Sequence, residues 1–578
     1  MIRILLTASI SLAIGSAAFP QTGWDYFDAN NIEAIISPVA NHFWDYSDNH
    51  YFIPKDSGTT SIFTSTLWIG GVDSTGLLHL AAERFRQSGK DYLPGPYSST
   101  DDYHFTTTSP WDRVWVINKQ EVEDWLDNPF SNPVPQSVLD WPAHGDASLG
   151  QASNLVPFVD MNGDGNYDPV NDFDYPAFKG DQTVLFLFND DGLLHTESGG
   201  QQLGVEIWGM AYGFNCPEDE ALHNTLFMEY HITNRSDMDY FDCAVGLWND
   251  FDLGNAQDDY IASDVTRNLF YVYNGDDEDQ DANGKTGYHF NLPAQGVRIL
   301  SGIQMDDDDL DNQPSVDTLG NYYGFGMDDG IIDNERLGLA HFTMHNNSAG
   351  PTGDPSNATE YDRFMNGYWK DGTPITYGGT GYDPNDSTVI RARCMFADSG
   401  DSVHYNTYGT VPSGGPIWTE AAAGNTPGDR RGVGSMGPFD LSAGEEVDFT
   451  IAYVFAQKPY DRLGAVTKMK AASDHIQELF DTQITECGPF DPGLTVGVED
   501  AASSQLALYP NPAGAFATVT GLATQASYLI IDMKGATVAS GKLSAGRAVI
   551  DLSALPSGVF VVQVMQEDTT DQIRLIKQ

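Results

Sequence analysis

The chain is poor in basic residues, with 28 Lys and Arg against 82 Asp and Glu, and its formal net charge is -54 at pH 7. Nucleic-acid binding needs a basic stripe that neutralises phosphates, and the sequence contains none. An anionic membrane surface is excluded as a partner for the same reason. Because a compact fold with this charge repels itself unless cations offset it, the composition favours bound divalent metal.

Long hydrophobic runs are also lacking. After residue 18, no segment reaches the roughly 18 consecutive apolar residues that a membrane-spanning helix needs. The apolar stretch Ile4–Ala18 is shorter than that, follows Arg3, and ends in the small residues Ser16–Ala18. A positive start, a short apolar region and a small-residue site are typical of a secretory signal peptide. We therefore expect residues 1–18 to be a signal peptide and the mature protein to have no transmembrane span.

Cysteine is scarce, and its spacing fits no zinc-binding pattern. Four cysteines in an exported protein allow three pairings, so the sequence does not fix the connectivity. One or two structural disulfides are the favoured interpretation, and buried free thiols stay open as the alternative. The residues are Cys216, Cys243, Cys394 and Cys487.

Catalytic motifs are missing as well: there is no H-E-x-x-H, G-x-S-x-G or phosphate-binding loop. Pairs of carboxylates suited to glycoside hydrolysis arise by chance among 82 acids, so they carry no information. Glu229 and His231 share one face of an expected strand, which the polar outer face of a sheet explains. Asp429–Arg431 is best explained as part of an internal salt-bridge network. Three tryptophans that could stack on sugars are better explained as core residues: Trp248, Trp369 and Trp418.

What the sequence does contain is a series of short β-type segments separated by 58 Gly and 30 Pro. This pattern predicts a mainly β fold, with a multidomain β-sandwich body over residues 19–486 made of two or more β units. In the clearest strand, Leu226, Met228, Tyr230 and Ile232 would face one way. The expected strands include residues 60–69, 113–118, 183–188, 224–234 and 449–456.

One segment near the end of the body has helical rather than β periodicity. Residues 461–480 place six apolar residues at helical spacing, with Asp461 as the N-cap, which predicts an amphipathic helix on the last sheet. Residues 487–504, rich in Gly, Pro and small residues, are expected to form a linker. The six apolar residues are Leu463, Val466, Met469, Ile476, Leu479 and Phe480.

The strongest local signal in the body is a loop with oxygen-bearing residues at alternating positions. Gly165 occupies the sixth position, where a calcium loop turns sharply, and Asn166 would offer its carbonyl at the seventh. The bidentate Glu of an EF-hand is missing, because Asn171 stands at that position. The loop therefore resembles calcium loops of the thrombospondin type 3 or dockerin kind; a plain turn with incidental acids stays the alternative. The expected calcium ligands are Asp160, Asn162, Asp164, Asn166 and Asp168.

Three further acidic clusters are weaker signals, and we expect each of them to be a solvated loop. At this net charge, some of them should nevertheless attract cations. The first contains Asp250, Asp252, Asp258 and Asp259; the second Asp277, Asp279, Asp281 and Asn283; the third Asp328, Asp329, Asp333 and Glu335.

The last part of the chain, residues 505–578, changes character and predicts a seven-stranded, Ig-like β-sandwich. Four blocks occur in order to the last residue: Tyr509–Pro512, Asp532–Gly535, Asp551–Phe560 and Arg574–Gln578. In these blocks the segment resembles the type A C-terminal sorting domain of type IX secretion substrates. The residues taken as the sorting signal are Tyr509, Pro510, Asn511, Pro512, Asp551, Leu552, Gly558 and Lys577.

The resemblance implies export to the periplasm and recognition of the tail by the type IX translocon in the outer membrane. It further implies tail removal with attachment to surface lipopolysaccharide, so the expected location is secreted or at the outer-membrane cell surface. Blocks of the body are similar to those of other large secreted proteins with this tail, which have no assigned activity. These blocks are Phe178–Gln182, Gly246–Asp250, Trp369–Gly372, Pro427–Arg431 and Gly437–Phe439.

Two hypotheses for function follow from these patterns. The first is a calcium-stabilised surface or secreted β protein with a structural, adhesive or binding role. The alternative is a secreted hydrolase acting on polysaccharide or peptide, because many type IX substrates are degradative enzymes.

Overall fold

The structure is a computed structural model, and the expected signal peptide and most of the expected linker lie outside the residues it describes. The described residues are 23–86, 89–100, 103–130, 132–305, 308–314, 324–385, 390–397, 417–491, 506–509, 513–522, 524–532, 537–556, 558–566 and 569–577.

Two antiparallel sheets form the described part of the body. The larger has nine strands in the order β14-β15-β16-β19-β12-β11-β10-β6, with β7 also paired to β10; the smaller has the order β17-β18-β13-β4-β5. The larger sheet comprises β6 (Leu93–Pro94), β7 (Trp115–Asn118), β10 (Gln182–Asn189), β11 (Val205–Gly213), β12 (Thr225–Asn234), β14 (Asp259–Asp264), β15 (Leu269–Asn274), β16 (Asn291–Ser301) and β19 (Glu446–Pro459). The smaller comprises β4 (Thr64–Asp73), β5 (Leu78–Ala82), β13 (Tyr240–Phe251), β17 (His341–His345) and β18 (Arg430–Leu441).

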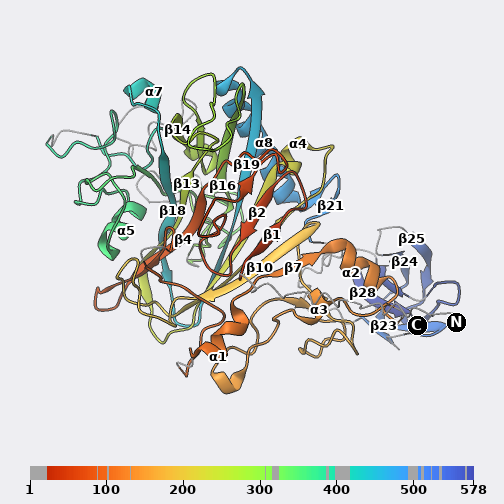
Figure 1. Cartoon of the computed structure of the whole chain (residues 1–578). Helices are drawn as coiled ribbons and strands as arrows, with labels where there is room; N and C mark the ends of the chain where they lie inside the picture. The colour runs from red at the N-terminus through yellow and green to blue at the C-terminus, as the bar shows by residue number, and fades with distance from the viewer. Residues whose placement is uncertain are drawn as a thin grey trace, which may run out of the picture.

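The two sheets pack face to face around one hydrophobic core (Figure 1). Phe270 of β15 stacks on Phe342 of β17, with ring centroids 5.1 Å apart. Ser65 of β4 shares a 2.6 Å hydrogen bond with Tyr453 of β19. The mainly β, sandwich-type body predicted from the sequence is therefore confirmed.

The central strand β12 is buried on the face that the alternating pattern predicts, and it is also partly buried on the opposite face. Leu226, Met228, Tyr230 and Ile232 are at most 2 % exposed and face one way, as predicted. The opposite face is not simply solvated, because Phe227 is fully buried against the ring of Phe490, 5.2 Å away. Residues from beyond the last body helix cover this part of the sheet.

The predicted helix is confirmed as α8 (Arg462–Thr482). The side chain of its N-cap, Asp461, accepts a 2.8 Å hydrogen bond from the amide of Gly464, which satisfies one of the helix's free N–H groups. Its apolar face buries Val466, Met469 and Ile476 against β16 and β19.

Shorter elements surround the sandwich within the described residues. The small strands are β1 (Asp25–Phe27), β2 (Glu33–Ile36), β3 (Tyr51–Phe52), β8 (Phe158–Val159), β9 (Tyr175–Pro176), β20 (Ile484–Thr485) and β21 (Gly488–Pro489). The short helices are α1 (Phe105–Thr108), α2 (Lys119–Leu126), α3 (Gln136–Leu139), α4 (Glu220–His223), α5 (Ala358–Met365), α7 (Glu420–Ala423), η1 (Ser109–Trp111), η2 (Ala147–Leu149) and η3 (Val265–Arg267).

The C-terminal segment forms a three-stranded and a four-stranded sheet around a separate core, as the sequence predicts. Val519, Ile530, Ile550 and Val562 are at most 1 % exposed in that core. The sheets are built from β22 (Ala507–Tyr509), β23 (Phe516–Leu522) and β26 (Gly546–Asp551), and from β24 (Ala526–Asp532), β25 (Thr537–Leu543), β27 (Gly558–Gln566) and β28 (Thr569–Lys577).

One disulfide joins Cys216, which follows β11, to Cys487, which lies between β20 and β21. It closes a loop of the chain over a sequence separation of 271 residues. Cys243 and Cys394 are both fully buried and lie outside this bond. The structure thus takes one of the pairings that the sequence left open.

We expect Cys487→Ser to destabilise the body by about 2–4 kcal/mol, because the bond restricts the unfolded chain over a long loop. The thermal unfolding midpoint of the variant should equal that of the reduced wild type. Reducing agent should cause no further loss in the variant. Equal midpoints for oxidised wild type and variant would show that this disulfide contributes nothing.

Candidate functional site

The loop predicted to bind calcium connects β8 to β9. The two carboxylate oxygens of Asp160 accept hydrogen bonds of 2.7 Å from the amides of Gly163 and Gly165. Asp164 Oδ1 accepts from the amide of Asn166 at 2.8 Å, which together with its side-chain bonds holds the pKa of Asp164 below its usual value. Gly165 has a φ of 78°, the left-handed conformation expected at the sharp turn.

Side-chain hydrogen bonds join three of the five predicted ligands, Asn162, Asp164 and Asn166, whereas Asp160 and Asp168 accept from other groups. Asn162 donates from its side-chain amide to Asp164 Oδ2 at 3.2 Å, and the Asn166 side chain donates to Asp164 Oδ1 at 3.0 Å. Asp168 instead accepts from the amide of Asn171 and so caps the following turn.

Asp174, which the sequence pattern did not indicate, binds the main chain near both ends of this loop. It is fully buried, and its two oxygens accept from the amides of Met161 at 2.7 Å and Asp168 at 2.8 Å. Burial raises the pKa of Asp174. The sequence does not reveal this role, because Asp174 lies well beyond Asp160 in the chain. The β8–β9 pairing brings Asp174 next to the loop.

The carboxylates of the loop do not converge on a single point. Among the described residues, one group of three His, Cys, Asp or Glu has ligand atoms within 4.8 Å of one another. It consists of Cys216, Glu218 and Cys487, and the disulfide uses both of its sulfur atoms. The Asp160 loop is not such a group. It offers a mixed set of carboxylate, amide and carbonyl oxygens, and these are the ligand atoms that calcium takes.

The basic pair Arg430–Arg431 joins internal salt bridges, as the sequence analysis expected. Arg430 lies 3.0 Å from Glu420, and Arg431 lies 3.2 Å from Asp250 and 2.7 Å from Asp354. These groups lie at the edge of the core, where an unpaired charge would cost several kcal/mol (about 3–5). The arrangement is structural and positions no reactive group toward solvent.

Trp248, Trp369 and Trp418 are at most 3 % exposed, which confirms their assignment to the core. Trp248 Nε1 donates to His345 Nε2 at 2.8 Å, so this nitrogen is an acceptor and the proton of the neutral ring sits on Nδ1. Burial keeps the pKa of His345 below its usual value.

Glu229 and His231 lie on the outer face of β12 and pair with each other at 2.8 Å. The ring of His231 stacks on Trp208, with centroids 3.8 Å apart. Burial alone would raise the pKa of Glu229, but Lys179 and His231 hold it at about 2. Burial would lower the pKa of His231, but hydrogen bonds to Glu229 and Glu446 raise it to about 9.

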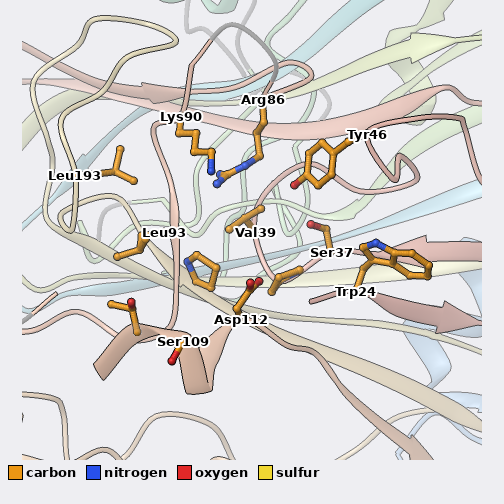
Figure 2. Close-up of a pocket in the computed structure, with 13 residues that line it drawn as sticks. Trp24, Ser37, Val39, Tyr46, Arg86, Lys90, Leu93, Ser109, Asp112 and Leu193 are labelled. Carbon is orange, nitrogen blue, oxygen red and sulfur yellow. The ribbon is translucent and has the colours of Figure 1, made fainter. Parts of the chain in front are cut away.

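A cavity of about 700 Å³ lies beside β6, a strand at the edge of the larger sheet (Figure 2). Figure 2 shows the side chains of Arg86 and Lys90 on one side of it, Asp112 opposite, and the rings of Trp24 and Tyr46 at its flank. The remaining lining residues are Ser37, Pro38, Val39, Leu93, Pro94, Thr108, Ser109 and Leu193.

Two of the residues that line this cavity have strained backbones. Tyr46 has a φ of 69° and Arg86 a φ of 54°, both in the left-handed region that non-glycine residues rarely occupy. Such strain persists only where surrounding contacts fix it, and it is concentrated at functional sites. Arg86 is fixed by Glu83, whose Oε1 lies 2.7 Å from its guanidinium, and by the carbonyl of Tyr92 at 2.9 Å.

The sequence analysis missed this cavity. Its lining comes from β6, from the α1–η1 junction and from segments beside β1, β2, β5 and β10, so no contiguous motif marks it. One weak signal was available: residues 84–90 carry three basic side chains in a chain that has only 28.

In the C-terminal segment, the structure places five of the eight sorting-signal residues. Leu552 is fully buried in the tail core, and Asp551 Oδ1 accepts from the amide of Ser553 at 2.9 Å. Gly558 and Lys577 are register partners in β27 and β28. Tyr509 lies in β22, whereas Pro510, Asn511 and Pro512 lie outside the described residues.

Comparison with known proteins identifies this segment. Residues 507–578 match the sequence model of a family described as the secretion system C-terminal sorting domain. The predicted type IX sorting tail is thus confirmed, and it marks the chain as a secreted or cell-surface protein recognised by the type IX machinery. No helix in the described part of the chain is long and apolar enough to cross a membrane.

No curated protein matches the chain. Among solved structures, a chain described as a polysaccharide lyase aligns with a TM-score of 0.19 and 7% identity. The alignment covers 85% of this chain and 47% of that one, so the chain spans about half the length of this neighbour.

The His231 pair predicts a specific pH dependence of stability. Because the pKa of His231 is raised in the folded state, its contribution is complete below about pH 6.5 and is lost as the pH rises through about 9. We expect His231→Gln to remove this loss from the curve of unfolding free energy against pH. Carboxylates elsewhere titrate in both proteins, so the difference between the two curves isolates His231. Parallel curves from pH 6 to 10 would contradict the assignment.

Proposed function

We propose that the protein is an exported, calcium-stabilised β protein that works outside the cell, or on its surface, by binding a ligand. The observation that carries the proposal is the cavity lined by Arg86 and Lys90. Its volume lies in the range typical of small-molecule sites, and its lining combines apolar walls with a few polar groups. Attachment to lipopolysaccharide after tail removal is part of the same proposal.

The chemistry of the cavity favours an anionic saccharide. The rings of Trp24 and Tyr46 supply flat apolar surfaces on which a sugar can stack. Lys90 supplies positive charge for a carboxylate or sulfate group, since Arg86 beside it is already paired with Glu83. Lys90 is exposed and forms no ion pair with another described residue, so its charge is available to a ligand. The hydroxyl groups of the lining offer hydrogen bonds to the sugar hydroxyls.

A hydrolase is the second candidate, and the cavity gives it less support. Glycoside hydrolysis needs two carboxyl groups flanking the scissile bond. Of the thirteen lining residues, all within the described chain, Asp112 alone carries a carboxylate, and none is His or Cys. A binding role therefore fits the lining better than hydrolysis does.

Binding should be tested with oligosaccharides of uronic acids, using titration calorimetry on the full chain after export. We expect Lys90→Ala to weaken binding about tenfold, because it removes one charge-assisted contact. Lys468→Ala, which removes an exposed lysine of α8 remote in sequence from the lining, is the matched control and should bind as wild type does.

A neutral oligosaccharide of the same length should bind more weakly than the uronate. Equal affinities for wild type and Lys90→Ala would remove the cavity from the proposal. Product formation from any glycan or peptide in the same assays would favour the hydrolase.

The Asp160 loop is the proposed calcium site. We expect chelation to lower the unfolding midpoint, and Asp164→Ala to lower the midpoint measured in calcium, because the variant removes the ion of this loop. At ten times the dissociation constant, bound calcium stabilises the folded state by ~1.4 kcal/mol. Asp146→Ala is the matched control, since Asp146 is an exposed turn-capping acid outside the loop that accepts from Ser148. Unchanged midpoints under both treatments would contradict calcium binding by this loop.

A further inference from the structure

A second group of acidic residues is buried where β14 begins. Asp259 at the start of the strand and Asp279 in the segment after β15 are both fully buried, and Asp258 lies beside them. Two of the weaker acidic clusters of the sequence therefore meet at one place. A buried carboxylate is costly unless hydrogen-bond donors or a cation compensate it.

Hydrogen bonds compensate only part of this group. Both oxygens of Asp279 accept from main-chain amides, those of Asn255 at 2.9 Å and Tyr288 at 2.5 Å. Asp259 Oδ2 accepts from the amide of Leu253 at 3.3 Å, whereas no donor of the described chain binds Asp259 Oδ1. Neither oxygen of Asp258 has a hydrogen bond of normal geometry with a described residue. The side chain of Asn255 lies close enough to oppose, but not to cancel, the rise in the pKa of Asp258.

A neutral side chain at the same place is also incompletely satisfied. Asn274 is the direct cross-strand partner of Asp259 in the β14–β15 ladder, so their side chains lie on one face of the sheet. It is fully buried. Its Nδ2 donates to the carbonyl of Asp276 at 3.3 Å, and its Oδ1 accepts from no donor among the residues that the structure describes. Asp258, Asp259 and Asn274 thus all carry side-chain oxygen atoms that no described donor satisfies, at the start of the β14–β15 ladder.

The charges near this group increase the cost. Burial, followed by the carboxylates of Asp258 and Asp279, holds the pKa of Asp259 well above its usual value. Burial, followed by Asp279, raises the pKa of Asp258 to about 7. The basic side chain of Arg462 lies at the outside: it donates to the carbonyl of Asn274 and pairs with Asp277, whose side chain is 79% exposed.

We propose that Asp258, Asp259 and Asn274 bind a calcium ion, with Asp279 as a nearby charge held by its main-chain hydrogen bonds. An all-oxygen set of two carboxylates and one amide, completed by carbonyls or water, is the coordination that calcium takes. Calcium is millimolar outside cells, so a site of modest affinity is filled there. This site is separate in sequence from the Asp160 loop and stabilises the β14–β15 edge of the larger sheet.

The test compares Asp259→Asn with the wild type by measuring bound calcium per chain and the unfolding midpoint in calcium and in chelator. The substitution keeps the shape of the side chain and removes its charge. We expect it to lower bound calcium by one equivalent per chain and to shrink the calcium-induced rise in midpoint by at least half. Asp277→Asn, on the exposed side of the same segment, is the matched control and should change neither value.

The competing state is a protonated carboxyl group without an ion. In that state Asp259→Asn would raise the midpoint in chelator and leave the calcium response intact, and this outcome would overturn the proposal. Asn274→Asp is the second variant. With an ion bound, it should enlarge the calcium-induced rise in midpoint; a lowered midpoint that calcium does not restore would also overturn the site.

The two calcium proposals fail independently in these measurements. Asp164→Ala removes the equivalent bound by the Asp160 loop and leaves the one at Asp259. A protein that loses calcium through Asp164→Ala but not through Asp259→Asn contains the loop site alone. The reverse pattern retains the buried site and rejects the loop.

Discussion

The constraint on which the rest of this structure depends is the compensation of buried negative charge. Most fully buried carboxylates in the described chain have clear partners. Asp190 accepts from the amides of Leu203 at 2.6 Å and Val205 at 2.8 Å. Asp264 pairs with Lys470 of α8 at 2.7 Å. Against this background, the unsatisfied Oδ1 of Asp259 needs a physical cause, and the proposed cation supplies one.

The few basic residues are used mainly to hold elements together. Arg298 of β16 and Arg267 of η3 both reach Asp474 of α8, at 3.1 and 2.9 Å, and so fix the helix to the larger sheet. Arg431 joins β18 to Asp250 of β13. Lys90, by contrast, lines the cavity, is exposed and forms no ion pair with another residue that the structure describes.

The local sequence pattern was sufficient to predict an element wherever the residues that define it are close together in the chain. The helix at α8 follows from apolar residues at helical spacing behind the N-cap Asp461, and the seven tail strands follow from short β segments between turns. The Asp160 loop was visible because all its oxygens lie within nine residues. The proposed buried site was not visible in the sequence, because Asp259 and Asn274 become neighbours only through the β14–β15 ladder. Taken one at a time, the acidic clusters are more simply explained as solvated loops.

The sequence by itself determined the class of the protein, its sorting tail and therefore its destination, since these rest on composition and on ordered local blocks. It left three disulfide pairings and the alternative of buried free thiols open, and the tertiary structure joins Cys216 to Cys487 and leaves Cys243 and Cys394 outside a disulfide. Only the tertiary structure decided which acids are buried without donors and which loops enclose the cavity. The physical reason is that burial and charge compensation depend on which strands become neighbours, and strand neighbours such as β16 and β19 lie far apart in the chain.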